Sequence, residues 1–207
     1  MKPAFLKRKN RWIEILLALF VLMMFCACAC AEDVTIVASG YCGGEWVNGV
    51  EGANLTYQLD SNGKLTISGQ GTMGYEPFQE YSNKIIAVEI EDGVTSIGEK
   101  AFDGCSILTS ISIPDGVTSI DEGAFWHCSS LTSINLPDDV TKIGRYAFDG
   151  CSNLTSISIP DGVTEIGDQA FWGCSSLASI NLPASLTQIG HSSFAGCSSL
   201  TSINLPD

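Results

Sequence analysis

The sequence predicts a repeat solenoid, in which short coils stack so that equivalent strands form a parallel β-sheet on one face. Two observations predict this fold. The same apolar residues return every 23 positions over the second half of the chain, as from Phe102 to Phe125. Within each repeat, apolar residues also alternate with small polar ones, as they do along a strand. A unit of this length cannot bury its own apolar side chains, so neighbouring units must stack into a continuous core.

Residues 1–31 have the layout of a secretory signal peptide. Basic residues between Lys2 and Arg11 precede an apolar run from Ile15 to Phe25, and small residues that suit cleavage follow it. We expect cleavage after Ala31. The apolar run is shorter than the ~20 residues that a membrane span requires, which disfavours an uncleaved anchor. Lipid attachment at one of the three cysteines before Ala31 is an alternative that would tether the protein to a membrane.

Residues 32–84 lack the repeat period and are rich in glycine. Apolar and polar residues alternate from Leu55 to Leu59 and again from Leu65 to Ile67, with the turn signal Asp60-Ser61-Asn62-Gly63 between them. This pattern predicts a β-hairpin. Because the terminal coil of a solenoid needs a differently built cover, we expect this segment to be a β-rich N-terminal cap.

Residues 85–207 contain about five and a half repeats, the first of them a degenerate copy that begins at Ile85. We expect the recurring phenylalanines and cysteines to form the repeat core. They are Phe102, Phe125, Phe148, Phe171 and Phe194, with Cys105, Cys128, Cys151, Cys174 and Cys197.

The alternation within one repeat predicts two strands and a return segment. Leu108 to Ile113 is the expected first strand, which ends at Pro114 because proline lacks a ladder donor. Val117 to Ile120 is the expected second strand, and Glu122 to Cys128 is expected to form a single helical turn. Successive first strands should form one parallel sheet with about 4.8 Å between neighbours.

The repeat L-x-x-I-x-I-P-x-x-V-T-x-I-G-x-x-A-F-x-x-C-x-x resembles the BspA-type leucine-rich repeats. The match spans Ile85 to Asp207 and departs from the pattern at Asp121, Leu186 and Ser193. The resemblance implies the leucine-rich-repeat fold and a secreted or cell-surface protein. It also implies a possible role in adhesion, since some family members are implicated in binding host matrix proteins or other microbes.

The charge of the chain restricts its partners. Of the 23 acidic residues only Glu14 precedes Ala31, whereas five of the ten basic residues do, so the segment after Ala31 has a formal net charge of −17. This charge excludes nucleic acid as an expected partner and disfavours anionic membranes. A row formed by Asp115, Asp138 and Asp161 could attract calcium or a basic partner. A solvated acidic face is the simpler explanation of the charge.

The cysteines and histidines do not form a recognisable chemical site. Cysteines on adjacent coils would be about 4.8 Å apart, whereas a disulfide needs Cβ atoms about 3.8 Å apart, so we expect buried free thiols. Disulfides between adjacent coils or a zinc site are the alternatives. His127 and His191 occupy different registers, and no serine has G-x-S-x-G surroundings. We therefore expect no enzyme, no catalytic residues, no bound metal and no cofactor.

Two surfaces are candidate ligand sites. The outward positions of the first strands carry small hydrogen-bonding side chains, which either contact a ligand or only solvate the sheet. They are Ser110, Ser112, Ser133, Asn135, Ser156, Ser158, Ser179 and Asn181. Trp126 and Trp172 share a register that otherwise holds Asp or Ala, which predicts an exposed aromatic strip for a protein or a sugar. Partial cover of the core is the alternative role of these tryptophans.

The chain stops at Asp207 in the middle of a repeat, without a C-terminal cap. An uncovered parallel edge favours pairing, so we expect either a fragment of a longer protein or self-association through the open C-terminal coil. Together these features predict a secreted or cell-surface binding or adhesion protein with a protein or glycan ligand, on host matrix or on another microbe by family resemblance. A self-assembling structural module of a surface layer is the alternative.

Overall fold

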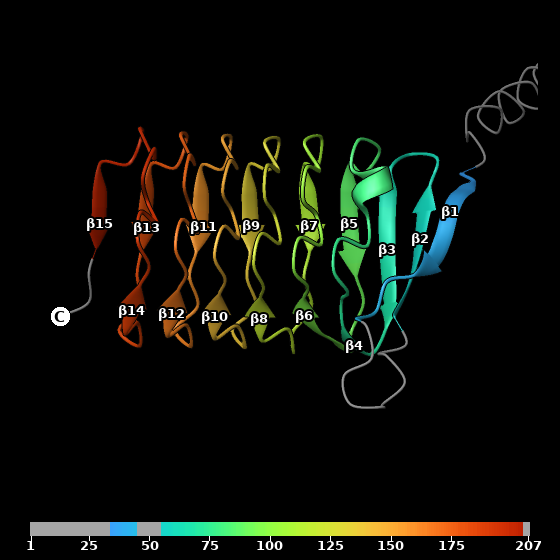
Figure 1. Cartoon of the computed structure of the whole chain (residues 1–207), viewed down its shortest axis with the longest axis horizontal. Helices are drawn as coiled ribbons and strands as arrows, with labels where there is room; N and C mark the ends of the chain where they lie inside the picture. Colours follow the sequence, from blue (N-terminus) through green and yellow to red (C-terminus); the bar gives the residue numbers. More distant parts are fainter. Residues whose placement is uncertain (1–33, 45–54, 205–207) are drawn as a thin grey trace, which may run out of the picture. The chain divides into compact units, whose positions relative to one another are not determined.

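The solenoid predicted from the repeat period is present in the computed structural model of the chain, which describes residues 34–44 and 55–204. The predicted signal peptide, residues 1–31, lies outside these ranges. Each coil contributes two strands, and each strand lies beside the equivalent strand of the next coil (Figure 1). The fold class expected from the sequence is therefore confirmed.

The first strands of successive coils form a parallel row. Their members are β3 (Lys64–Gly69), β5 (Ala87–Ile90), β7 (Ser110–Ser112), β9 (Ser133–Asn135), β11 (Ser156–Ser158), β13 (Ser179–Asn181) and β15 (Ser202–Asn204). Equivalent residues lie opposite one another, as Ile134 and Ile157 do.

This row is not the single continuous sheet expected from the sequence. Its hydrogen-bonded ladder is interrupted between β7 and β9 and again between β11 and β13. A three-residue strand forms few ladder bonds, so a small displacement between two coils is enough to separate them. The row thus consists of a three-stranded segment, β3 to β7, and two strand pairs, β9 with β11 and β13 with β15, separated by gaps in the ladder.

The second strands form one uninterrupted sheet of six parallel strands. They are β4 (Gly71–Thr72), β6 (Val94–Ile97), β8 (Ser119–Ile120), β10 (Lys142–Ile143), β12 (Glu165–Ile166) and β14 (Gln188–Ile189). The threonine that precedes each strand from β8 to β14 strengthens this stack: Thr118 Oγ1 donates to the Thr95 carbonyl and Thr141 Oγ1 donates to the Thr118 carbonyl, both at 3.2 Å. These bonds explain why threonine recurs at this position of the repeat.

The return segments are built from tight turns rather than from the expected helical turn. The Phe102 N–H donates to the Ala124 carbonyl of the next coil at 2.8 Å, whereas the Cys105 N–H donates to the Phe102 carbonyl at 3.1 Å. Because many N–H groups of the segment donate to the neighbouring coil, they cannot also support a helix. Within the described ranges the only helix is the short 3-10 helix η1 (Gln79–Tyr81).

The predicted hairpin is present at the N-terminal end of the array. β1 (Ile36–Tyr41) and β2 (Leu55–Asp60) are antiparallel, β2 and β3 are antiparallel, and β3 then pairs in parallel with β5. Asp60 Oδ1 stabilises the turn by accepting the N–H groups of Asn62 and Lys64, each at 2.9 Å. Strand β3 therefore joins the antiparallel hairpin to the parallel row.

A stack of phenylalanine rings forms the centre of the core. Phe102, Phe125, Phe148 and Phe171 are fully buried, and neighbouring rings lie 5.2 to 5.4 Å apart along the stack. Phe194 continues the stack and is partly buried. Phe78, which the repeat pattern did not include, extends it into the N-terminal segment at 5.5 Å from Phe102.

The cysteine ladder runs beside this stack. The described cysteines, Cys42 among them, are buried free thiols. Burial raises the pKa of Cys42 and Cys105 to about 12. The expected thiol ladder therefore forms part of the packed core of the array.

Candidate functional site

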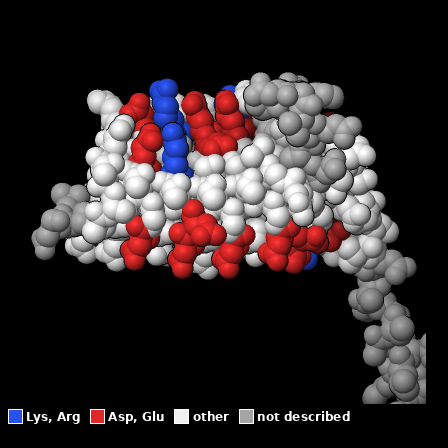
Figure 2. Space-filling model, turned by 90° about the horizontal axis from the view of Figure 1, so that it is seen from below, with Lys and Arg blue, Asp and Glu red and all other residues white. Residues whose placement is uncertain are grey.

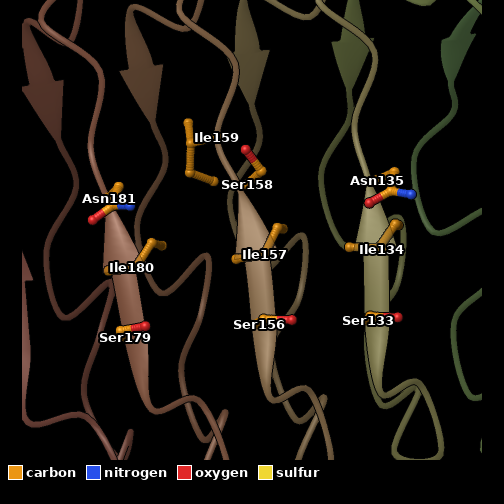
Figure 3. A pocket seen from close by; sticks show the side chains of 10 residues that line it. All are labelled: Ser133, Ile134, Asn135, Ser156, Ile157, Ser158, Ile159, Ser179, Ile180 and Asn181. Atoms are coloured by element: carbon orange, nitrogen blue, oxygen red, sulfur yellow. The ribbon is translucent and has the colours of Figure 1, made fainter.

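The outer face of the first-strand row contains a shallow groove of about 320 Å³ (Figure 3). Strands β9, β11 and β13 line it. The lining residues are Ser133, Ile134, Asn135, Ser156, Ile157, Ser158, Ile159, Ser179, Ile180 and Asn181. It lies across the interruption between β11 and β13, where no ladder bond joins the two strands.

Six of the eight polar residues singled out on the first strands lie together in this groove. Ser133 and Asn135 on β9 are exposed, while Ile134 between them is 3% exposed, as the two-residue period of a strand requires. The same alternation occurs on β11 and β13. Ser110 and Ser112 lie on β7 and are exposed, but they are not part of the groove lining.

The groove lining is electrically neutral. It contains serine hydroxyls, asparagine amides and isoleucine side chains, and no acidic or basic side chain. Hydroxyl and amide groups both donate and accept hydrogen bonds. Such a lining suits an uncharged polar ligand better than an ion, because it offers no charge to pair with one.

The two tryptophans differ in exposure. Trp126 is partly buried: its ring stacks on His127 at 5.1 Å and on Tyr146 at 5.7 Å. Trp172 is 46% exposed. No ring contact joins the two indoles in the described part of the chain. Of these two tryptophans, Trp172 has the larger exposed aromatic surface, whereas Trp126 packs against His127 and Tyr146 of the return segments.

Asp149 occupies the tryptophan register but is buried, contrary to the exposure that its polar side chain predicts. Although its side chain is polar, Asp149 is only 6% exposed, and burial raises its pKa; nearby His127 and the Trp126 indole N–H oppose this rise. Neither Trp126 Nε1 nor Asp149 Oδ1 has a partner with hydrogen-bond geometry among the described residues. A polar residue type was therefore a misleading indicator of exposure at this position.

His127 lies near two carboxyl groups from the adjacent coils. Its Nδ1 atom is 3.8 Å from Asp103 Oδ1, and its positive charge, when present, lowers the pKa of both Asp103 and Asp149. Burial raises the pKa of Asp103 as it does that of Asp149. The repeat symmetry concealed this cluster, because His127 occupies a glycine position.

The second histidine contacts a serine hydroxyl on the surface. Ser192 Oγ lies 2.8 Å from His191 Nδ1, but Asp168 Oδ1 accepts the backbone N–H of His191 rather than a ring N–H. A catalytic triad needs an acidic group that orients the imidazole ring. This exposed pair of chain neighbours does not have that arrangement.

Lys100 links the N-terminal segment to the repeats. Its Nζ atom donates to the Tyr75 hydroxyl at 3.0 Å, pairs with Glu76 at 3.2 Å and lies 6.0 Å from the centre of the Trp126 ring. The repeat pattern does not indicate this cluster, since Tyr75 and Glu76 precede the periodic part of the chain.

The charged side chains are unevenly distributed. Figure 2 shows Lys and Arg side chains in a compact stripe, with Asp and Glu beside it and in a separate band. Lys142 pairs with Glu165 at 3.4 Å and Arg145 pairs with Asp168 at 3.6 Å.

Among the described residues, no group of three or more His, Cys, Asp or Glu side chains could hold a metal ion. Nor does the described part contain a helix of the length and hydropathy that a membrane crossing requires.

Solved structures with this fold come from several bacteria. A leucine-rich repeat protein of T. pallidum has a TM-score of 0.63 and 29% identity, and the match covers 71% of this chain and 77% of that one. A leucine-rich cell surface protein of Faecalibacterium prausnitzii has a TM-score of 0.52 and 26% identity, and the match covers 76% of this chain and 53% of that one. A leucine-rich repeat protein of Bacteroides ovatus has a TM-score of 0.51 and 27% identity, and the match covers 77% of this chain and 54% of that one. The chain thus spans about half the length of the latter two proteins.

The sequence itself matches a family model. Among curated proteins no match was found. The model for the BspA type leucine-rich repeat region, however, matches residues 72–201 in six copies, which is more than half of the chain. The protein therefore belongs to the BspA-type leucine-rich repeat family.

Proposed function

We propose that the chain is a secreted or cell-surface binding protein that presents the outer face of its first-strand row to a protein or glycan ligand. The observation that carries this proposal is the groove across β9, β11 and β13, in which six independently predicted polar residues lie together. A similar protein of Faecalibacterium prausnitzii is described as a cell surface protein, and the N-terminal sequence of this chain resembles a signal peptide. The role is binding rather than catalysis.

Binding of the full chain to immobilised matrix proteins and glycans tests this proposal. The double variant Ser133→Arg/Ser156→Arg places two long charged side chains in the groove and should abolish binding. Ser110→Arg makes the same kind of change on β7, outside the groove, and should leave binding within twofold of the original. Unfolding curves in urea establish that each variant is folded before binding is compared.

The tryptophan variants separate the two candidate faces. Trp126→Ala/Trp172→Ala should leave binding intact if the groove is the site. If this variant loses binding while Ser133→Arg/Ser156→Arg retains it, the binding site lies on the return segments and the proposal is wrong.

Self-assembly is the second candidate function. Ile189 on β14 and Ile203 on β15 are 42% and 39% exposed, which favours contact between this part of the array and another apolar surface. The molar mass measured over a hundredfold range of concentration separates the two functions. A mass that rises with concentration, together with no binding to any immobilised ligand, would replace the binding proposal with this one.

A further inference from the structure

From β7 to β15, one register of the first strands holds either serine or asparagine. The position holds Ser112 on β7, Asn135 on β9, Ser158 on β11, Asn181 on β13 and Asn204 on β15. Where asparagines occupy adjacent coils, their amides bond to each other: Asn204 Nδ2 donates to Asn181 Oδ1 at 2.8 Å. An unbroken run of asparagines at this position would thus satisfy its own amide groups.

Ser158 interrupts that run inside the groove. Asn135 and Asn181 lie two coils apart, a distance of about 9.6 Å, so their amides cannot bond to each other across the shorter serine. Figure 3 shows the amide oxygen of Asn135 and the amide nitrogen of Asn181 both directed toward the β11 strand between them. The gap therefore has an acceptor on one side and a donor on the other.

The remaining lining is suited to a small uncharged molecule. Ser156 and Ser158 contribute hydroxyls at the centre, and Ile157 and Ile159 are each 7% exposed beneath them. The groove volume of about 320 Å³ lies at the lower end of the range for small-molecule sites. Protein interfaces, by contrast, usually depend on Trp, Tyr or Arg anchors, and this lining contains none of them.

We propose that the gap at Ser158 is a subsite for one sugar ring of an uncharged glycan, whose hydroxyls bond to Asn135, Asn181 and the central serines. This inference rests on the proposed binding function and specifies its ligand class. A sugar ring carries donors and acceptors on the same groups, as the gap requires. An anionic glycan does not fit, because the lining has no cation to pair with it and the chain is strongly acidic.

Filling the gap is the decisive experiment. Ser158→Asn supplies an amide that bonds to Asn135 and Asn181 in place of the ligand, as Asn204 bonds to Asn181. Binding is measured by calorimetry with the full chain and four neutral hexasaccharides, those of glucose in α-1,4 and β-1,4 linkage, of mannose and of N-acetylglucosamine. At least one should bind, and Ser158→Asn should weaken that binding tenfold or more without lowering the urea midpoint of unfolding.

Two matched variants distinguish gap filling from other effects. Ser158→Ala removes the hydroxyl but keeps the gap open, and it should weaken binding less than Ser158→Asn does. Ser110→Asn adds the same amide on β7, outside the lining and in the other outward register, so it does not face Asn135 and should change the affinity less than twofold. Equal effects of Ser158→Asn and Ser110→Asn would overturn the assignment of the gap.

Charged and peptide probes complete the test. Hexagalacturonate should not bind, and neither should an acetylated, amidated Ser-Gly hexapeptide. If none of the neutral hexasaccharides binds, or if the peptide binds with the same dependence on residue 158, the glycan inference is wrong. The broader binding function would still stand if Ser133→Arg/Ser156→Arg abolished capture on an immobilised protein, and it would fail if no immobilised ligand bound.

Discussion

Cys128 Sγ donates a hydrogen bond of 3.2 Å to the carbonyl oxygen of Phe102, which belongs to the preceding coil. The bond recurs from Cys151 to Phe125 at 3.2 Å and from Cys174 to Phe148 at 3.1 Å. Each thiol thus satisfies a buried carbonyl beside the phenylalanine stack. This bond accounts for the cysteines of the repeats from Cys128 to Cys197 in a chain that is predicted to be exported, without requiring disulfides.

The first prediction concerns thiol reactivity. Burial raises the pKa of Cys105 and Cys151 to about 12, so very little reactive thiolate is present at about pH 8. Iodoacetamide should leave both residues unmodified in the folded protein and modify both in urea, as measured by mass spectrometry of the peptides. Cys197, which is 9% exposed, is the internal control and should be labelled first. Disulfide-linked peptides from the folded protein would contradict the thiol ladder.

The second prediction concerns the aromatic stack. Phe125 is fully buried and its ring lies 5.4 Å from that of Phe102 and 5.3 Å from that of Phe148. Phe125→Ala should lower the free energy of unfolding by about 3–5 kcal/mol, because it leaves a cavity in the core. Phe194→Ala should cost less, since Phe194 is only partly buried. Urea unfolding followed by circular dichroism gives both values, and similar losses would argue against a stack centred on the middle coils.

The third prediction concerns one left-handed backbone position. Gly104 and Gly150 have φ values of +69° and +73° in equivalent turns, so alanine is strained at both. A Cβ atom at Gly150 would also lie 2.8 Å from His127 Cδ2, whereas at Gly104 nothing lies within 4 Å. Gly150→Ala should therefore destabilise the fold more than Gly104→Ala, which costs about 1 kcal/mol.

A double-mutant cycle checks the cause of that difference. In a His127→Gly background the ring is gone, so Gly150→Ala should cost no more than Gly104→Ala does in the original chain. Thermal unfolding of the four proteins measures the coupling. Additive effects of the two substitutions would exclude contact with His127 as the reason.

The fourth prediction concerns pH. Burial raises the pKa of Asp149 above its ordinary value of 3.8, so the folded state holds this proton more tightly than the unfolded state. The ionised carboxylate therefore reduces stability at neutral pH, and this loss disappears as the pH falls through the folded pKa toward 3.8. Asp149→Asn should stabilise the protein at about pH 7, and the advantage should shrink by about pH 4. A gain that is independent of pH would show that ionisation is not its source.

The fifth prediction concerns the acidic row. Asp115, Asp138 and Asp161 occupy equivalent positions on adjacent coils, where like charges about 4.8 Å apart repel one another. Raising sodium chloride from about 10 to 500 mM should increase the melting temperature by screening this repulsion. Asp138→Asn should reduce the salt dependence, whereas Glu91→Gln, outside this row, should change it less. Melting temperatures that do not depend on salt would show that the repulsion is negligible.

Periodicity predicted the solenoid, the two strands of each coil and the buried Phe125 and Cys128, because a repeated unit has to place equivalent residues in equivalent surroundings. The predicted pattern did not include Phe78, since its separation from Phe102 in the sequence is one residue longer than the repeat length. It also predicted a helical turn in the return segment, where N–H groups such as that of Phe102 instead bond to the next coil.

The candidate site was predicted only in part. The alternation of strand residues identified the exposed serines and asparagines, but not which of them lie together. Trp126 and Asp149 were expected on an exposed strip, whereas the turns that carry them bury Asp149 and stack Trp126 on Tyr146. Residue type alone does not reveal such contacts, because they depend on how the turns of adjacent coils are placed.

The sequence by itself determined the class of fold, the coil length, the core and the outward polar rows, since these follow from spacing and from the need to bury apolar side chains. Only the tertiary structure decided where the strand row is interrupted, and that the groove lies over β9, β11 and β13, at Ser158 and not at Ser112. The local pattern is the same in both coils. Local alternation cannot distinguish them, because the placement of neighbouring coils depends on packing across the whole core.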